Sequence, residues 1–292
     1  MNITVVIPAL NAAGTLPAQL AALGRQIGAA AFHVVVVDNG SSDGTAGVAE
    51  RFAAPFSLSV VHEPVRGINS ARNAGVAAAG EGLVLLCDAD DEVHPQWVAA
   101  MAAAIAPFTW VGGRLDYEAL NSPATRQVWG AATTSTYKER TPFVDTTYGC
   151  NCGFWRSMWS QLGGFDTNIS GTGGDETEFF MRAHAAGYRR TDVPDAVVSY
   201  RLRPGRRAMV RQRYRQGRNQ VLMRQLPGGA LLPGAETVRG ALRALAKLIL
   251  VSPMYAVSRR GRSAWAAAVA RNAGKLAGLW NARRSRARPT PV

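Results

Sequence analysis

Two stretches decide the fold: Val34-Val35-Val36-Val37-Asp38-Asn39-Gly40-Ser41-Ser42-Asp43-Gly44 and Leu83-Val84-Leu85-Leu86-Cys87-Asp88-Ala89-Asp90-Asp91. In each, an apolar run of strand length leads directly into a group of acidic side chains. Ligands of open parallel α/β sheets bind outside the carboxyl ends of the strands. We therefore predict two buried strands that deliver carboxylates to one crevice, which would hold a cation, a nucleotide or both.

The first hundred residues alternate between strand and helix patterns. The patterns predict strands over 3–8, 33–38, 58–62 and 83–87, and helices over about 14–27, 44–53, 68–79 and 95–105. Such alternation is typical of a doubly wound, mostly parallel α/β sheet flanked by helices. We place the boundary of this α/β domain at 1–203 and predict a basic helical C-terminal extension over 204–292.

Composition and charge limit the class of protein. The 292 residues are 47% hydrophobic, enough for one substantial core. The three cysteines, one of them inside a predicted strand, do not suggest a disulfide framework. No signal peptide precedes the first strand, so we expect a cytoplasmic protein. The net charge of +13 is uneven, because residues 1–200 carry −7 and residues 201–292 carry +20.

The basic tail could meet anionic lipid, nucleic acid or an acidic partner, and charge alone does not choose among them. We expect a basic amphipathic helix over Arg206 to Arg224. The apolar stretch Ala241 to Val257 is interrupted by two cations and a proline, and it is too short to span a bilayer. A helix over Ala264 to Trp280, with apolar and basic faces, has the composition of helices that lie in an anionic membrane interface. The alternative is packing against the α/β domain or a second subunit in a homodimer.

A third acidic group follows a glycine-rich approach. Asp175, Glu176 and Glu178 open a predicted helix over Thr177 to Ala186. Acids at a helix start can serve as caps, because unpaired backbone N–H groups and the helix dipole stabilise them there. A catalytic role is the alternative.

Six motifs occur in an order that resembles the family 2 glycosyltransferases: Ile7-Pro8-Ala9-Leu10-Asn11, Asp38-Asn39-Gly40-Ser41-Ser42-Asp43-Gly44-Thr45, Ser70-Ala71-Arg72-Asn73-Ala74-Gly75, Asp88-Ala89-Asp90-Asp91, Gly163-Gly164-Phe165-Asp166 and Gly174-Asp175-Glu176-Thr177-Glu178. The resemblance covers residues 1 to about 190. It implies a GT-A fold and an inverting enzyme that uses a nucleotide sugar.

The resemblance also implies a donor site. Its nucleotide-binding residues would be Pro8, Leu10, Asn11, Asp38, Asn39, Arg72 and Asp88. A divalent cation, Mn²⁺ or Mg²⁺, would be held by Asp90 and Asp88, with Asp91 as a second contact, because carboxylate oxygens suit hard cations. Many relatives carry a His after the last strand, where this chain has Tyr200 and adjacent arginines that could bind diphosphate instead.

Inverting transfer needs a base for the acceptor hydroxyl. The family supplies an acid pair, which here reads Asp175-Glu176, so Glu176 matches the usual catalytic position and Asp175 is the alternative. Acceptor-side candidates are Trp155, Trp159, Asn151 and the segment Tyr137 to Tyr148, since sugars and apolar aglycones stack on aromatic rings.

The sequence therefore predicts transfer of a hexose or deoxyhexose from a nucleoside-diphosphate sugar donor to a hydroxyl acceptor that is a saccharide, a lipid-linked molecule or a natural product. Two alternatives stay open: a non-catalytic relative that binds nucleotide sugar, and a nucleic-acid-binding protein that uses the basic tail. The tail has no recognisable nucleic-acid motif, which disfavours the second. Attachment to the inner face of the cell membrane would follow from the C-terminal helices.

Overall fold

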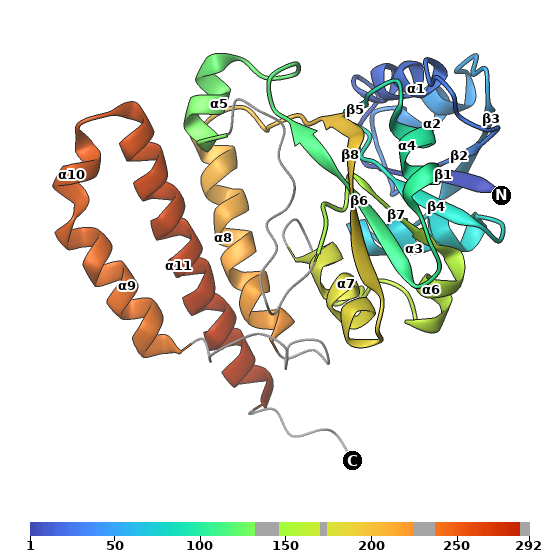
Figure 1. Cartoon of the computed structure of the whole chain (residues 1–292). Coiled ribbons are helices and arrows are strands. Elements are labelled where there is room, and N and C mark those ends of the chain that lie inside the picture. The colour runs from blue at the N-terminus through green and yellow to red at the C-terminus, as the bar shows by residue number, and fades with distance from the viewer. Residues whose placement is uncertain (132–145, 170–173, 225–236, 287–292) are drawn as a thin grey trace. The chain divides into compact units, whose positions relative to one another are not determined.

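The computed structural model describes residues 1–131, 146–169, 174–224 and 237–286 (Figure 1). The described residues belong to two compact units. The first comprises 1–120, 146–169 and 175–201, and the second comprises 121–131, 174, 202–224 and 237–286.

A single mixed sheet organises the first unit. Within the described residues its eight strands have the order β3-β2-β1-β4-β7-β6-β8-β5. The strands are β1 Ile3–Ala9, β2 His33–Asp38, β3 Ser57–His62, β4 Leu83–Leu86, β5 Glu92–Val93, β6 Thr109–Asp116, β7 Cys152–Trp155 and β8 Arg189–Ser199. Strands β1 to β4 are parallel, whereas β7 runs antiparallel to β4 and β6. The carboxyl ends of β1, β2 and β4 consequently meet at one edge.

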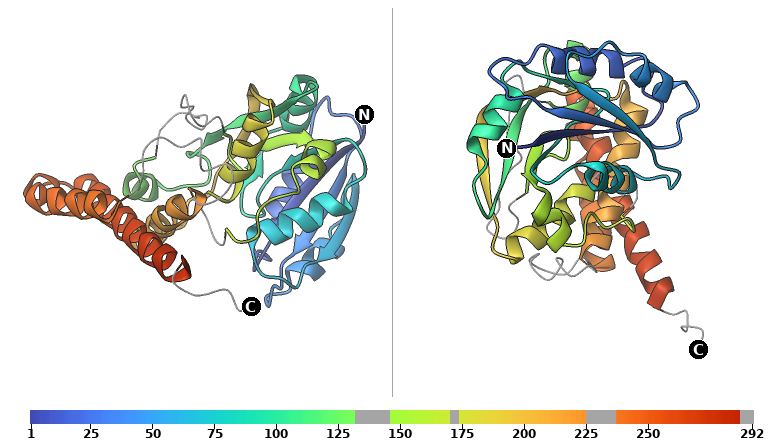
Figure 2. Two further views of the ribbon diagram at one scale, coloured as in Figure 1. Left: turned by 90° about the horizontal axis from the view of Figure 1, so that it is seen from below. Right: turned by 90° about the vertical axis from the view of Figure 1, so that its right-hand side faces the viewer.

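Helices cover both faces of this sheet. One core contains side chains of α1 (Leu16–Gly24), α2 (Thr45–Glu50) and α4 (Trp97–Ala104), and the other contains those of α3 (Ile68–Ala78), α6 (Arg156–Gln161) and α7 (Asp175–Ala185). Strand β1 contributes side chains to both cores, because side chains alternate along a strand. Val5 and Ile7 lie in the first core and Val6 lies in the second. The right-hand view of Figure 2 shows α1 and α2, in blue, on the side of the sheet opposite α3, in cyan.

The predicted alternation is confirmed, because each of the eight elements expected in the first hundred residues has a counterpart. The largest differences are at helix ends, because α1 ends at Gly24 rather than near residue 27 and α2 ends at Glu50 rather than near residue 53. The first helix also begins at Leu16 rather than near residue 14. Residues just before it bind the neighbouring loop instead: the N–H groups of Ala12 and Ala13 donate to the side chains of Thr45 and Asp43. The predicted helix at 177–186 is also present, as α7.

The second unit is helical. Its helices in the described residues are α5 (Pro123–Trp129), α8 (Arg206–Met223), α9 (Val238–Leu250), α10 (Ser252–Ala256) and α11 (Arg259–Arg286). Helices α8 and α11 pack closely, because Gly217 of α8 and Gly274 of α11 each lie against the backbone of the other helix, where a Cβ would overlap a carbonyl oxygen. Among the helices described, none combines the length and the apolar content needed to cross a bilayer.

Candidate active site

Asp38 ends β2 and lies at the same sheet edge as the acids that follow β4, because both strands flank β1 in parallel. Only 7% of the residue is exposed. Its Oδ1 accepts a hydrogen bond from the N–H of Ser41 at 3.2 Å, and its Oδ2 lies 3.6 Å from Nδ1 of His62. The turn after β2 and the end of β3 therefore hold this carboxylate at the carboxyl edge of the sheet.

The loop after β1 is tied to the same turn by Asn11. Its backbone has a left-handed φ of 52°, and its Oδ1 accepts from the N–H of Ser42 at 2.9 Å. Of the other two residues predicted here, Pro8 is buried within β1, whereas Leu10 is 46% exposed. Leu10 and Asn11 thus remain accessible beside Asp38.

Asn39 has a structural position. It is 4% exposed, and its Nδ2 donates to the carbonyl oxygens of Glu63 and Val65 at 2.9 and 2.8 Å. Its Oδ1 accepts from the N–H of Gly67, the residue before α3, at 2.8 Å. These hydrogen bonds of the Asn39 side-chain amide join the end of β2 to the loop that leads into α3. They favour a role in holding the loop over a role in contacting a ligand.

Asp88, Asp91 and Cys150 come together after β4. One ligand atom from each, a carboxylate oxygen or the thiol sulfur, lies within 4.8 Å of the other two. Burial raises the pKa of Asp88 to about 7 against the opposing charge of Arg72, and the neighbouring carboxylates add to the rise. Burial likewise raises the pKa of the Asp91 carboxyl and of the Cys150 thiol. The site gathers acidic groups whose ionised forms burial disfavours and a bound cation would favour.

Arg72 links this cluster to the third acidic group. It is 3% exposed on α3, and its Nη1 donates to Asp175 Oδ2 at 2.6 Å, while its Nη2 lies 4.0 Å from Asp88 Oδ1. Burial opposes the charge, but the carboxylates of Asp175, Asp88 and Glu176 outweigh it, so the pKa of Arg72 is raised. Gly149 permits the arrangement, because a Cβ there would lie 2.5 Å from Arg72 Nη2 and 3.1 Å from Glu176 Cβ.

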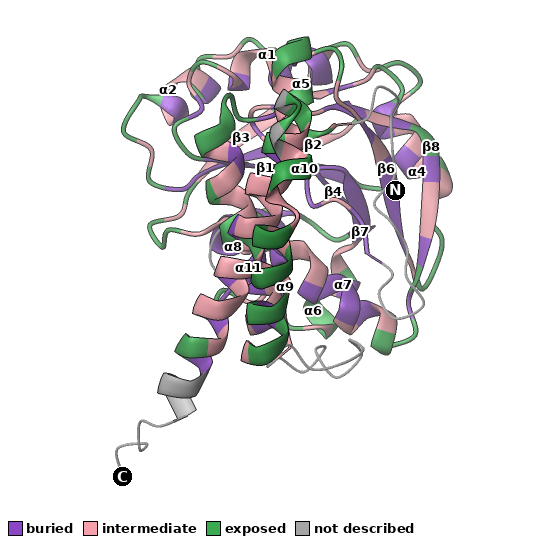
Figure 3. Cartoon of the chain, turned by 90° about the vertical axis from the view of Figure 1, so that its left-hand side faces the viewer, coloured by how far each residue is buried: buried purple, intermediate pink, exposed green. Residues whose placement is uncertain are grey.

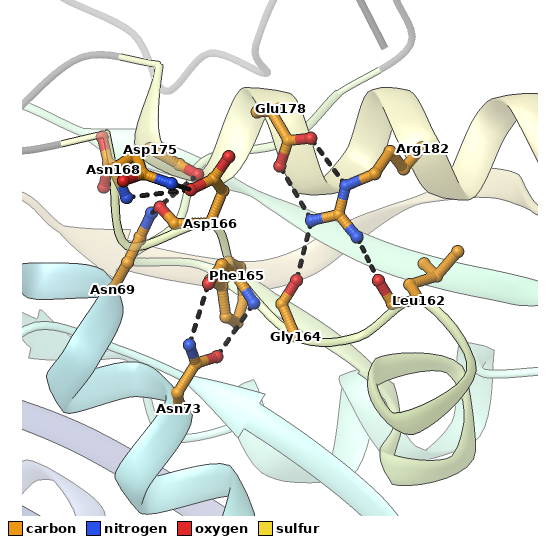
Figure 4. A network of polar contacts seen from close by, with 10 residues as sticks. All are labelled: Asn69, Asn73, Leu162, Gly164, Phe165, Asp166, Asn168, Asp175, Glu178 and Arg182. Carbon is orange, nitrogen blue, oxygen red and sulfur yellow. Dashed lines mark hydrogen bonds and ion pairs between the residues drawn. The ribbon is translucent and has the colours of Figure 1, made fainter. Parts of the chain in front are cut away.

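The start of α7 is anchored by a polar network (Figure 4). Asp175 is 5% exposed and committed to Arg72, and Glu178 is 2% exposed and paired with Arg182 at 2.6 Å. Nη2 of Arg182 also donates to the carbonyl oxygen of Gly164 at 2.7 Å. Glu176 differs from both neighbouring acids, since it is only half-buried. Asp175 and Glu178 are therefore buried acids in ion pairs that hold α7 in place, whereas Glu176 is accessible.

This arrangement matches a known family. The sequence model described as Glycosyl transferase family 2 matches residues 4–163. The chain belongs to this family. The matched region contains the first two acidic strand ends and Arg72, and it ends before Asp175 and Glu176 of α7.

Relatives extend the match beyond that region. Glycosyltransferase AglE of Haloferax volcanii is 26% identical over 224 residues, which cover 75% of this chain and 73% of that protein. A mannosyltransferase from Pyrobaculum calidifontis, solved in complex with GDP-Man and Mn²⁺, shares the fold with a TM-score of 0.63 at 22% identity, over 96% of this chain and 87% of that chain. TarS of S. aureus, residues 1–349 with UDP-GlcNAc, has a TM-score of 0.55 at 16% identity, over 97% and 92% of the two chains. The GT-A-like fold is thereby confirmed.

Arg201 of this family 2 chain, one of the arginines beside Tyr200, contacts the acidic loop directly. Its N–H donates to Asp91 Oδ1 at 2.8 Å, and its Nε donates to the carbonyl oxygen of Asp90 at 2.8 Å. The pairing of β5 with β8 brings these residues together across 110 positions of sequence. Asp90 itself is half-buried and lies outside the Asp88, Asp91 and Cys150 group.

Among the acceptor-side candidates, Trp155 lies away from the acids, whereas Asn151 directly follows Cys150 of the acidic group. Trp155 pairs with Leu83, the first residue of β4, so it lies at the sheet edge opposite the acids, and its Nε1 donates to the carbonyl oxygen of Ala106. Trp159 donates to Asn73 Oδ1 at 2.9 Å. Asn151 is fully buried, accepts from Trp97 Nε1 at 2.7 Å and donates to two backbone carbonyls. These placements favour packing roles. Of the segment Tyr137 to Tyr148, residues 137–145 lie outside the described residues.

Proposed function

We propose that this protein transfers a sugar from a nucleoside diphosphate to a hydroxyl acceptor with inversion at the anomeric carbon. The sugar is a hexose or deoxyhexose, and residues 1–203 carry the activity. One observation supports this most strongly: the buried guanidinium of Arg72 lies between the carboxylates of Asp88 and Asp175, so the acids after β4 and those of α7 belong to one site.

The carboxylate oxygens after β4 suit a divalent cation. Within the described residues, Asp88 Oδ1 is buried and has no hydrogen-bond partner, and its nearest cation is the Arg72 guanidinium at 4.0 Å. We assign Asp88 and Asp90 as the residues that would hold Mn²⁺ or Mg²⁺, although Asp90 lies outside the group that Asp88 forms with Asp91 and Cys150. Asp91, whose Oδ1 accepts from the N–H of Arg201, would be the second contact. When bound, the cation would neutralise charge on the departing diphosphate. Arg201 adds fixed positive charge where many relatives have a histidine.

The nucleotide would lie along the edge formed by the loops after β1 and β2. Asp38 is held there by its own turn, with Leu10 accessible beside it. The solved relatives bind GDP-Man in one case and UDP-GlcNAc in another, so both bases are candidates. Asn39 would support this edge through Glu63, Val65 and Gly67 rather than contact the base.

Glu176 is the base in this proposal. Asp175 already accepts a charge-assisted hydrogen bond from Arg72 at 2.6 Å and is 5% exposed, so its carboxylate is committed to holding α7 on α3. Glu176 lies next to the same guanidinium but is half-buried, which leaves it accessible to an acceptor hydroxyl. It would remove the hydroxyl proton as that oxygen attacks the anomeric carbon, and no covalent enzyme intermediate forms.

Nucleotide binding is tested by thermal stabilisation. A panel of UDP, GDP, dTDP and CDP, each with and without Mn²⁺, should give one nucleotide whose stabilising effect depends on the metal, because a ligand that binds only the native state raises the melting temperature. Asp88→Asn should abolish the metal-dependent part. A stabilisation by nucleotide that is the same with and without metal would reject the cation assignment.

The base is tested by comparing two acids of one helix. Glu176→Gln should retain donor binding and stability while turnover falls on the order of a hundredfold or more. Asp175→Asn should instead weaken stability and donor binding together, because it leaves the buried Arg72 without its closest partner. Glu50→Gln, at an exposed position of α2, serves as the control. A fully active Glu176→Gln variant would exclude this residue as the base. The anomeric configuration of the product, read by NMR, tests inversion.

A further inference from the structure

The second unit has a group of large apolar side chains that water contacts directly. They lie on α9, on α10 and just after α10, and their exposed fractions are 52% for Leu242, 66% for Ile249, 80% for Leu250, 77% for Met254 and 87% for Val257. We call these five residues, with the cations beside them, the α9–α10 surface. Large exposed apolar side chains that gather on neighbouring helices mark interaction sites more often than ordinary surface.

The spacing along α9 gives this surface two adjacent rows. Leu242, Ala246 and Ile249 recur at helical spacing and are exposed. Arg239, Arg243 and Lys247, also exposed, recur every four residues and form a row of cations next to them. The first two turns of the helix also border a hollow of about 650 Å³ lined by residues of both rows. Figure 3 shows the outward side of α9 as largely exposed.

The opposite side of α9 is already packed. Ala241 is 3% exposed, Leu245 and Leu248 are half-buried, and Nε1 of Trp265 on α11 donates to the carbonyl oxygen of Leu248 at 2.9 Å. The helix therefore has an inner apolar side that meets its own unit. The outer apolar row lies on the other side of the helix and stays exposed.

The helix predicted from sequence to lie on a membrane is a weaker candidate. Residues 264–280 belong to α11, which packs along α8 through Gly274 and Gly278 against the carbonyl oxygens of Tyr214 and Arg218. Contacts so close leave this side of α11 no access to lipid. The exposed apolar row of α9 and α10 is the better match to a helix lying in an interface.

Charge selects the occupant. Residues 237–292 contain no Asp or Glu, and Lys or Arg occurs at 239, 243, 247, 259, 260 and 262. A second copy of the chain, related by a two-fold axis, would bring two such basic surfaces together, which like-charge repulsion disfavours. Nucleic acid would use the cations but would leave the apolar row in water. An anionic bilayer satisfies both rows, because headgroups meet the cations and the acyl boundary accepts the apolar side chains.

We propose that the α9–α10 surface docks this protein on an anionic lipid bilayer. Arg239, Arg243 and Lys247 meet the headgroups, and the apolar side chains of Leu250, Met254 and Val257 enter the boundary between headgroups and acyl chains. Docking is a property of the helical unit and does not depend on the donor or the reaction.

Co-sedimentation of the full chain with vesicles tests the proposal. The wild type should bind vesicles of phosphatidylcholine mixed with phosphatidylglycerol and should bind pure phosphatidylcholine far more weakly. The triple variant Arg239→Gln, Arg243→Gln, Lys247→Gln should lose on the order of a hundredfold in affinity for the vesicles, because each cation near the membrane surface raises that affinity about fivefold. Its binding should also depend less on salt. The triple variant Leu250→Ser, Met254→Ser, Val257→Ser should lose a similar factor at any salt concentration.

Matched controls separate docking from bulk charge and from misfolding. Arg206→Gln, Arg207→Gln, Arg211→Gln removes the same charge from exposed positions of α8 and should bind vesicles within about threefold of wild type. All variants change exposed residues, so their melting temperatures should match the wild type. A Leu250→Trp variant adds a direct readout, because insertion should shift its fluorescence to the blue and allow quenching by brominated lipid.

Three outcomes would overturn the proposal. Equal vesicle binding by the wild type and both α9–α10 variants would show that this surface does not bind the bilayer. An equal loss of vesicle binding in the α8 control would show that binding depends on net charge and not on the α9–α10 surface. A dimer in light scattering that the serine variant dissociates, with no vesicle binding by the wild type, would assign the surface to a second copy of the chain.

Discussion

Replacing Arg182 with Met should destabilise the first unit strongly, because it leaves Glu178 as a buried charge without its partner. The Glu178 side chain is 2% exposed. Arg182 donates to its two oxygens at 2.6 and 2.8 Å, to the carbonyl oxygen of Gly164 at 2.7 Å and to that of Leu162 (Figure 4). The guanidinium also lies over the Phe179 ring, 5.5 Å from its centroid.

The magnitude follows from which groups lose partners. Breaking a buried ion pair by removing one member costs about 3–5 kcal/mol, whereas replacing both members with apolar groups removes the stranded charge. In the double variant Arg182→Met, Glu178→Leu only the two carbonyl oxygens remain unpaired, at about 1 kcal/mol each. The double variant should therefore be more stable than the single Arg182→Met variant by about 1–3 kcal/mol.

Urea unfolding followed by circular dichroism measures these differences, and Arg182→Met should also lower the melting temperature by roughly 10 °C. Arg189→Met, at an exposed position that follows the same helix, is the control for loss of an arginine. The reasoning fails if Arg182→Met costs under about 1 kcal/mol, or if the double variant is no more stable than the single one.

Two further predictions concern the acidic site. Gly149→Ala should destabilise the fold by about 1–3 kcal/mol and weaken donor binding, because its Cβ would press on Arg72 and Glu176; unchanged nucleotide affinity and melting temperature would contradict the close approach. Asp88→Asn should stabilise the metal-free protein at pH 8 by about 2 kcal/mol but not at pH 4. The folded-state pKa of Asp88, about 7, lies above the usual value of 3.8, so the free energy of unfolding of the wild type falls as pH rises between these values. The expected gain is smaller than the full effect of the shift, because 29% of the Asp88 side chain is exposed to water, which screens its charge. Melting temperatures of both proteins across pH test this, and parallel curves would refute it.

Local patterns predicted the first half of the fold well. Apolar runs such as Val34 to Val37 are buried strands, and the acids that end them lie at one edge, because strands of a parallel sheet share a direction. The acids of α7 were also recognised at a helix start. Such features depend on a few consecutive residues and on a periodicity that the sequence displays directly.

The roles of individual side chains depended on partners far away in sequence. Arg72 and Asp175 are 103 residues apart, and their contact distinguishes Asp175 from Glu176, which no local pattern could do. Trp155 was expected near the acceptor, but the antiparallel direction of β7 carries it to the opposite edge of the sheet.

The sequence by itself therefore determined the family, through a resemblance carried by six ordered motifs. It also determined the alternation of elements and the edge at which acids gather, because these two follow from short-range periodicity and strand direction. Only the tertiary structure decided which acid is paired, which asparagine holds a loop and which C-terminal helix is exposed. Both α9 and α11 carry apolar and basic residues, yet packing against α8 covers much of α11, while the outer row of α9 stays in contact with water. Burial and pairing are properties of surfaces that meet, and a single stretch of chain contains only one of the two surfaces.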